Sequence, residues 1–304
     1  MKKYIDLQVN GYLGIDFSEP GLTLEGVKTV TDELYRMGTL AFCPTVISSS
    51  PETYEKNLPV LARAFENPDL APRLLGIHLE GPFISPRPGA RGAHTESNII
   101  PPDIELFDHY RYLSRDNICL LTVAPEIEGA IRLINHAAKL GITVSLGHHT
   151  AGLDDIKGAV DAGATAVTHL GNGVPNSLPR HPNQIWDQLA EDRLTPMLIT
   201  DGHHLPPSFI KSVFDMKGTG NVAIVSDSAP IAGLKPGKYN TLGLDVVLEE
   251  SGKLWVPEGN HLAGSSSNIR DCVGYLDSLE FLGKKSLEAA AIYTPLRLLG
   301  RAVL

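Results

Sequence analysis

The sequence has 304 residues, of which 42% are hydrophobic, enough for a sizeable core in one large domain or two ordinary ones. Its net charge of -9, without any cluster of lysines or arginines, argues against nucleic acid as a partner. No apolar run approaches the roughly 18 residues of a membrane span, which argues against a membrane protein. Cys43, Cys119 and Cys272 lie far apart, so we expect no disulfide framework and a cytoplasmic location.

Eight short β-rich runs recur along the chain, and most of them are continuous apolar runs rather than alternating ones. That pattern is typical of strands covered on both faces, as in parallel sheets. The predicted strands are residues 4–9, 40–47, 74–80, 118–124, 142–147, 165–170, 196–200 and 221–226.

Helical patterns fill most of the gaps between these strands. Ser50 and Pro51 form a typical helix start, and Gly141 stands where a helix commonly ends. The expected helices cover residues 23–38, 50–66, 124–141, 151–163, 206–218, 268–282 and 286–298. This order and length predict a (β/α)8 TIM barrel, with residues 1–304 as one catalytic domain. An open, doubly wound sheet is the alternative fold.

Residues 231–265 interrupt the strand–helix rhythm. Two β runs there surround the turn-like sequence EESGK, which predicts a β-hairpin inserted after the eighth strand.

Polar and ionisable residues follow most of the predicted strands. They are Gln8, Asn10, His78, Glu80, His148, His149, His169, Asn172, Asp201, His203, His204 and Asp227. In a (β/α)8 barrel these strand ends converge in one bowl, whereas an open sheet places its chemistry at one switch point. Burying so many ionisable groups is costly unless they are paired or ligate a metal.

Glu80, His148 and His169 are the metal ligands that we predict. Two histidines and one carboxylate, with a position left for water, form a known catalytic zinc site. Asp227, at the end of the eighth strand, would accept a proton from that water and return it to a leaving amine. Zinc is the expected ion, and Fe2+, Mn2+ and Co2+ also suit this ligand set.

A single histidine at a strand end is more often structural than catalytic. We therefore expect His149 and His203 to be packed or to support the site from behind. His109, His136 and His261 lie in helix or loop patterns and are expected to be solvated. The metal site rests on four strand ends that carry suitable residues in the expected order.

Nine motifs occur in order along the chain: DLQVNGYLGIDF, GIHLEGPFIS, RGAH, TVAPE, VSLGHHTA, GATAVTHLGNGVP, DGHHL, VSDSAP and LAGSSSNI. Together they resemble the N-acetylglucosamine-6-phosphate deacetylase family of the amidohydrolase superfamily, from about residue 5 to residue 298. The resemblance implies a metal-dependent amide hydrolase that converts N-acetylglucosamine 6-phosphate to glucosamine 6-phosphate and acetate. It also implies a homodimer as the assembled state.

The resemblance carries roles onto matching positions. Glu80, His148 and His169 would be the metal ligands, and Asp227 the general base and acid. His94 would polarise the amide carbonyl or hold the oxyanion. The positions that would hold the phosphosugar are Asn172, Gly173, Arg180 and His204. The guanidinium among them is the cation that an anionic phosphate needs.

The sequence departs from the family pattern in three places. Gln8 and Asn10 replace the His-x-His of most amidohydrolases, and neutral amides bind a second divalent ion poorly, so we expect one ion. The small β-sandwich that family members build outside the barrel is expected to be missing. Gly171 and Gly173 replace larger residues, which leaves open a different sugar or one without a phosphate.

Two other functions stay open at this stage. One is another amide hydrolase on the same barrel, acting on a different N-acetylated or non-phosphorylated substrate. The other is a barrel that binds a sugar without catalysis. The second is disfavoured because Asp227 and all three predicted metal ligands are present.

Overall fold

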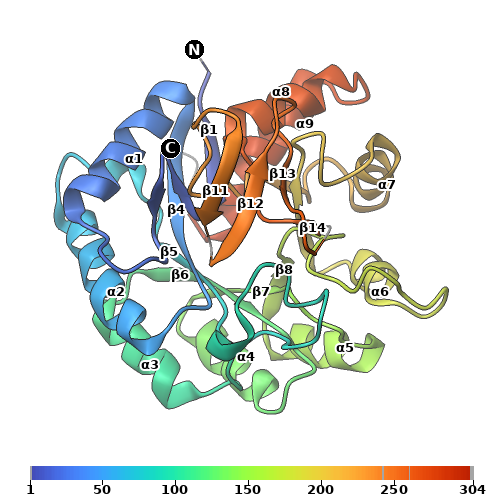
Figure 1. Ribbon diagram of the computed structural model, residues 1–304. Helices are drawn as coiled ribbons and strands as arrows, with labels where there is room; N and C mark the ends of the chain where they lie inside the picture. Colours follow the sequence, from blue (N-terminus) through green and yellow to red (C-terminus); the bar gives the residue numbers. More distant parts are fainter. Residues whose placement is uncertain (1, 242, 260, 302–304) are drawn as a thin grey trace.

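The computed structural model describes residues 2–241, 243–259 and 261–301. Eight strands form one sheet in the order β1-β4-β5-β6-β7-β8-β9-β10, every ladder between them is parallel, and helices surround them (Figure 1). They are β1 (Tyr4–Val9), β4 (Thr39–Ile47), β5 (Ile77–Glu80), β6 (Ile118–Val123), β7 (Thr143–Leu146), β8 (Ala164–Val167), β9 (Thr195–Ile199) and β10 (Ala223–Val225). The predicted (β/α)8 barrel is confirmed.

Helices cover the outside of the barrel with one apolar face each. In α1, Val27, Val30 and Leu34 are buried at helical spacing, and Gly38 ends the helix with a φ of 115°. The long helices are α1 (Leu24–Met37), α2 (Pro51–Glu66), α3 (Ile104–Leu113), α4 (Ala130–Lys139), α5 (Leu153–Ala162), α7 (Pro207–Lys217) and α8 (Ile269–Ser278). Shorter ones are η1 (Ala71–Arg73), η2 (Glu96–Asn98), α6 (Gln184–Ala190), α9 (Lys284–Glu288), the π-helical η3 (Ala289–Tyr293) and α10 (Thr294–Leu298).

The described part of the chain adds two α-helices, besides the short η1 and η2, to the predicted set. Helix α3 begins at Asp103, whose side chain accepts a hydrogen bond from the Leu106 amide at 3.1 Å. Helix α6 begins at Asn183 in the same way, with the Ile185 amide as donor. These two helices supply crossovers that the sequence patterns did not indicate.

A small antiparallel sheet interrupts the barrel after β10. Its four strands are β11 (Gly237–Thr241), β12 (Leu244–Leu248), β13 (Leu254–Val256) and β14 (His261–Leu262). The EESGK sequence forms the turn between β12 and β13, closed by a bond from the Glu249 amide to the Lys253 carbonyl at 3.0 Å. The insertion is therefore larger than the expected single hairpin. A short hairpin of β2 (Gly11–Tyr12) and β3 (Ile15–Asp16) follows β1.

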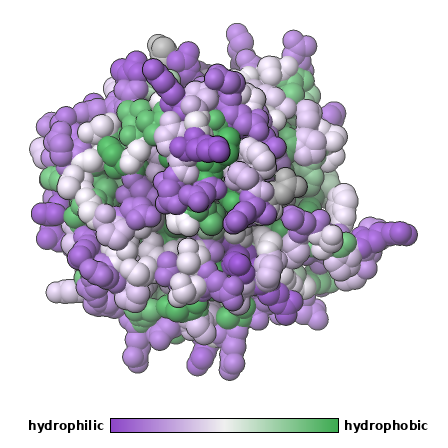
Figure 2. Space-filling model, in the orientation of Figure 1, coloured by the Kyte–Doolittle hydropathy of each residue, from purple (hydrophilic) through white to green (hydrophobic). Residues whose placement is uncertain are grey.

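The face of the molecule seen in Figure 1 carries mostly hydrophilic residues, with apolar ones scattered among them (Figure 2). Within the described part of the chain, no helix has the length and apolar character that crossing a lipid bilayer requires.

Candidate metal centre and catalytic cavity

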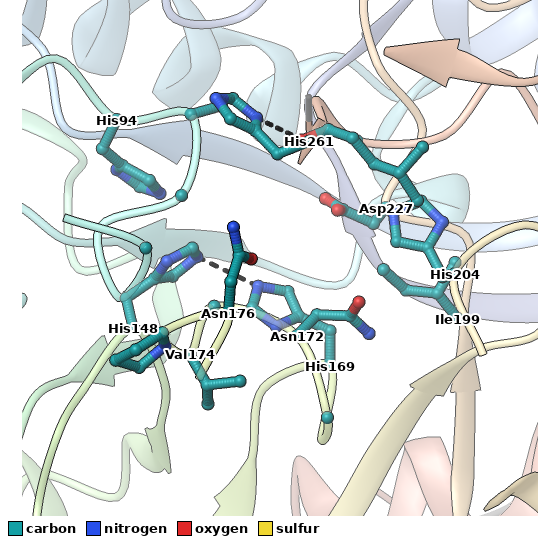
Figure 3. A pocket seen from close by; sticks show the side chains of 18 of the residues that line it. His94, His148, His169, Asn172, Val174, Asn176, Ile199, His204, Asp227 and His261 are labelled. Atoms are coloured by element: carbon teal, nitrogen blue, oxygen red, sulfur yellow. Dashed lines mark hydrogen bonds between the residues drawn. The ribbon is translucent and has the colours of Figure 1, made fainter. Parts of the chain in front are cut away.

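A cavity of about 750 Å³ lies at the carboxyl ends of the barrel strands and collects most of the predicted site residues (Figure 3). Those that line it are Asn10, Glu80, His94, His148, His169, Asn172, Gly173, His204 and Asp227. The small sheet contributes to the same cavity through His261 and Leu262 of β14. His261, which the sequence placed in solvent, is therefore part of the cavity wall.

Three of the polar residues that follow strands have left-handed backbones. The φ angles are 52° at His148, 33° at His169 and 50° at Asp227. This conformation is uncommon for residues other than glycine, and it persists only where surrounding contacts hold it. Hydrogen bonds to their carbonyl oxygens provide such contacts, for example from the Ser265 amide to Asp227 at 2.8 Å. The backbone thus turns these side chains into the cavity at some energetic cost.

Glu80, His148 and His169 bring three ligand atoms to one point. Glu80 Oε1 lies 3.1 Å from Nε2 of His148 and 3.1 Å from Nε2 of His169. The two Nε2 atoms are 3.0 Å apart. Neighbouring corners of a tetrahedral zinc shell are about 3.3 Å apart for bonds of about 2.0–2.1 Å, so the triangle is of the right size. Among the described residues, this is the one group of His, Cys, Asp and Glu side chains close enough to share an ion.

The hydrogen bonding of His148 indicates that the triangle is built for a cation. Its Nδ1 lies 2.9 Å from the Ala90 carbonyl oxygen, which can only accept, so Nδ1 carries the proton. In the neutral ring, Nε2 then presents its lone pair to Glu80 Oε1, another acceptor. Two lone pairs at this distance repel each other unless a positive charge lies between them, so the residues present fit a divalent metal ion.

Two glycines let the chain close around the imidazole rings. A Cβ at Gly173 would lie 3.0 Å from His148 Nδ1 and 3.0 Å from His169 Cε1. A Cβ at Gly92 would lie 2.9 Å from His148 Cε1. Both glycines have positive φ, 61° and 57°, so a side chain at either would be both strained and crowded. Gly173, predicted to contact substrate, thus also packs against the ligand rings.

Burial and the neighbouring charges shift the pKa values of Glu80 and His169 in opposite directions. Burial raises the pKa of Glu80, but His148 and His169, when protonated, donate to its carboxylate and lower its pKa well below its usual range. Burial lowers the pKa of His169, but the hydrogen bond and charge of Glu80 outweigh this and raise it. The carboxylate is therefore ionised and ready to ligate.

Gln8 and Asn10, expected in the places of the usual His-x-His pair, donate hydrogen bonds to the carboxylates of the site. The amide of Gln8 donates to Glu80 Oε1 at 2.9 Å. The amide of Asn10 donates to Asp227 Oδ1 at 2.8 Å. Each neutral side chain thus points a hydrogen-bond donor at a carboxylate of the site.

His94 stands next to the predicted metal ligands in the cavity wall. Its ring meets that of His148 edge-on, with centroids 4.4 Å apart. Nδ1 accepts a hydrogen bond from the Ser48 amide at 3.3 Å, so the proton of the neutral ring is on Nε2. Burial, with the charge of His148 as a further cause, lowers the pKa of His94 to about 3, which keeps the ring neutral. Ser48 was not indicated by any sequence pattern.

The predicted phosphosugar residues divide into two groups. Asn172 lines the cavity, and its buried Nδ2 has no hydrogen-bond partner among the described residues. His204 lines it too, and its Nδ1 is held by Asp201 Oδ2 at 2.8 Å. Burial raises the pKa of Asp201, but the His204 hydrogen bond and charge lower it to about 2. Arg180 is exposed and is not part of the described cavity wall.

The remaining strand-end histidines support the structure. His149 is buried behind the cavity, where its Nε2 lies 2.6 Å from Gln188 Nε2 and its Nδ1 accepts from the Ala151 amide. His203 is hydrogen-bonded to the Ser251 carbonyl in the small sheet. His78 lies deeper in the barrel, 2.8 Å from the Thr122 hydroxyl.

No protein-family model matches the chain. It is 35% identical over 311 residues to the N-acetylglucosamine-6-phosphate deacetylase of Caenorhabditis elegans, covering 98% of this chain and 73% of that protein. It is 28% identical over 303 residues to the N-acetylgalactosamine-6-phosphate deacetylase of Escherichia coli O157:H7, covering 98% and 77%.

A solved structure supports the same relationship. It is a point mutant of the N-acetyl-D-glucosamine-6-phosphate deacetylase of Mycobacterium smegmatis in complex with N-acetyl-D-glucosamine-6-phosphate. It matches with a TM-score of 0.90 at 25% identity and covers 99% of this chain and 78% of that one. Sequence and fold therefore agree, and the chain belongs to the N-acetylglucosamine-6-phosphate deacetylase family.

Proposed function

We propose that this protein hydrolyses the acetamide of N-acetylglucosamine 6-phosphate to glucosamine 6-phosphate and acetate, with residues 1–304 as one catalytic domain. The observation that carries the proposal is the triangle of Glu80, His148 and His169 with Asp227 in the same cavity. Release of acetate by the purified, metal-loaded protein tests it. Absence of acetate from this sugar phosphate would refute it, and acetate from its epimer N-acetylgalactosamine 6-phosphate alone would replace the sugar. The epimer is included because an E. coli relative carries that name.

We propose that the triangle would hold one divalent cation, zinc. Such a cation lowers the pKa of a water molecule and polarises the amide carbonyl of the substrate. Zinc suits a His2Glu set, as Fe2+, Mn2+ and Co2+ also do. A single ion is supported by Gln8 and Asn10, whose amide donors already bond to Glu80 and Asp227.

The residues around the cation have separate roles in proton transfer, in stabilising the negative charge and in binding the substrate. Asp227 accepts the proton of the attacking water and passes it to the amine as the carbon–nitrogen bond breaks. His94 donates its Nε2 hydrogen to the oxygen that gains negative charge. Asn172 and His204 bind the phosphosugar from the cavity wall, and the unpaired Asn172 Nδ2 supports this role. Arg180, outside that wall, is proposed as a phosphate contact from the family resemblance alone.

The rate is expected to fall in acid as Asp227 becomes protonated. Burial and the charge of Glu80 raise the pKa of Asp227 to about 6. Only the ionised form accepts a proton, so kcat falls about tenfold per pH unit below this pKa. A bound cation would oppose this rise, so the midpoint lies at or below about 6. A pH–kcat profile of the metal-loaded protein measures it, and a kcat that does not fall in acid over the whole range in which the metal stays bound would contradict this role.

Loss of phosphate recognition is expected when the proposed phosphate residues are shortened. His204→Ala and Arg180→Ala each raise KM for N-acetylglucosamine 6-phosphate about 10- to 100-fold, because a charge-assisted hydrogen bond is lost. The rate constant kcat/KM for N-acetylglucosamine itself stays unchanged. Arg63→Ala, an exposed arginine of α2 outside the cavity wall, is the matched control. Equal losses on both sugars would show that these residues do not recognise the phosphate.

We further propose a cytoplasmic homodimer. The three cysteines are free thiols, as in a reducing compartment. An apolar groove between α6 and α7, beside the half-exposed Trp186, supports a second copy as partner. Light scattering of the purified protein measures the assembly, and a monomer at micromolar concentration would refute the dimer.

A further inference from the structure

The barrel closes between its first and last strands, β1 and β10, with few main-chain bonds. Strand β1 forms a regular ladder with β4, and β10 forms one with β9. Across the closing seam, the described residues show one isolated bridge, between Val9 and Ser228, with a bond from the Asn10 amide to the Ser228 carbonyl at 2.9 Å. Other bonds must hold the two strand tips in register.

The buried carboxylate of Asp6 supplies such bonds. Asp6 is 1% exposed. Its Oδ1 accepts from the Ser226 amide of the opposite strand at 3.1 Å and from the Gln8 amide at 3.3 Å. Its Oδ2 accepts from the Ser226 hydroxyl at 2.6 Å. One side chain therefore joins the tips of both strands.

Both tips that Asp6 holds carry groups of the catalytic site. Gln8 donates to Glu80, and Ser226 directly precedes Asp227 with its left-handed backbone. Ser226 is fixed further, because its hydroxyl accepts from the Ser228 amide at 3.1 Å and its carbonyl from the Ser265 hydroxyl at 2.5 Å. A displacement of the Asp6 side chain would thus change the positions of both Glu80 and Asp227.

We propose that Asp6 is a positioning residue for the reaction, which sets the orientation of Asp227 through Ser226 and that of Glu80 through Gln8. It touches neither substrate nor metal ligand. The kinetic part of this inference rests on the proposed function.

The seam requires a carboxylate rather than an amide at this place. Burial raises the pKa of Asp6 to about 7, so above that pH the carboxylate is ionised and acceptor-only, and it satisfies two N–H groups and one O–H together. An asparagine would turn an NH2 group toward the Ser226 hydroxyl, which then has to donate elsewhere. The nearest alternative is the Gln8 carbonyl, 3.3 Å from that hydroxyl. Asp6→Asn therefore conserves shape while it rearranges the bonds at the Asp227 tip.

The first test separates positioning from mere stability. In Asp6→Asn, kcat per bound metal is expected to fall about 10- to 100-fold, since small misplacements of catalytic groups cost this much. KM and metal content stay within about twofold of the wild type. The control is Thr143→Val at the start of β7, which removes a part-buried bond of 2.6 Å to the Leu298 carbonyl. It lowers Tm but leaves kcat per bound metal unchanged.

A second variant and a second readout keep the inference testable whatever the stability of Asp6→Asn. Ser226→Ala deletes the hydroxyl and is expected to lower kcat per bound metal in the same direction. The double variant loses less than the product of the two single losses, because both remove one interaction. Hydrogen exchange of the Ser226 and Gln8 amides is expected to speed up in Asp6→Asn and not in Thr143→Val.

Two results would overturn the inference: kcat per bound metal unchanged in Asp6→Asn and Ser226→Ala, or exchange at Ser226 unchanged. Failure of the proposed function is a separate result, since it appears as a wild-type protein without acetate release. In that case the exchange comparison still decides whether Asp6 holds the β10 tip.

Discussion

Removing the metal with a chelator is expected to abolish acetate release, and about one equivalent of Zn2+ per chain is expected to restore it. The fall is at least about a thousandfold, because a bound cation supplies several kcal/mol of stabilisation to such reactions. Metal analysis before and after chelation, together with the acetate assay, measures both effects. Zn2+ also raises Tm of the chelated protein, because it binds the folded state at Glu80, His148 and His169.

The ligand variants sharpen this prediction. His148→Ala and His169→Ala each remove one corner of the triangle, so both are expected to lose stoichiometric metal and activity together. His203→Ala is the matched control, because that histidine bonds to the Ser251 carbonyl outside the cavity wall. It keeps the metal and the rate. Wild-type activity in a chelated, metal-free sample would contradict the metal site.

The strands were predictable because a run of consecutive apolar residues indicates a strand that is buried on both faces. A parallel strand covered on both faces needs apolar residues at consecutive positions, and runs such as residues 142–147 satisfy this without long-range information. Helix α6 was missed because it has only seven residues and depends on a cap at Asn183. Strand β14, with two residues, forms only by pairing with β13 and has no periodic signal of its own.

The metal triangle was predictable because the carboxyl ends of parallel barrel strands meet at one end of the barrel. Glu80 ends β5, and His148 and His169 follow β7 and β8, so the barrel alone brings them together. The contacts that orient them were not predictable. Ala90 and Ser48 bond to histidines 58 and 46 residues away along the chain, through pairs that leave no local pattern.

The positions of side chains in loops were even harder to predict from the sequence. Arg180 follows the predicted site residues Asn172 and Gly173 closely in sequence, but its side chain is exposed outside the cavity wall. Sequence spacing does not determine the direction of a side chain in a loop rich in glycine and proline. His261 was expected in solvent but lines the cavity, because the small sheet brings this distant residue to it.

Asp227→Asn is expected to keep the metal and lose the reaction. Asp227 is not a corner of the metal triangle, so the metal content is expected to stay that of the wild type. Asparagine has almost the same shape, and its carbonyl oxygen still accepts the hydrogen bond from Asn10. It cannot take a proton from water, so kcat falls about 10²- to 10⁴-fold while KM changes little. Steady-state kinetics and metal analysis of the same sample measure the two effects.

Asp16→Asn provides the matched control for this loss. Asp16 is another buried carboxylate, and burial raises its pKa to about 7. Its Oδ1 accepts from the Ser18 amide, and it lies outside the catalytic cavity wall. Neutralising it removes a buried charge of the same kind without touching the proton path, so kcat is unchanged. The acid limb of the pH profile is also expected to disappear in Asp227→Asn and to persist in Asp16→Asn. A rate in Asp227→Asn within tenfold of the wild type, with metal bound, would assign proton transfer to another group.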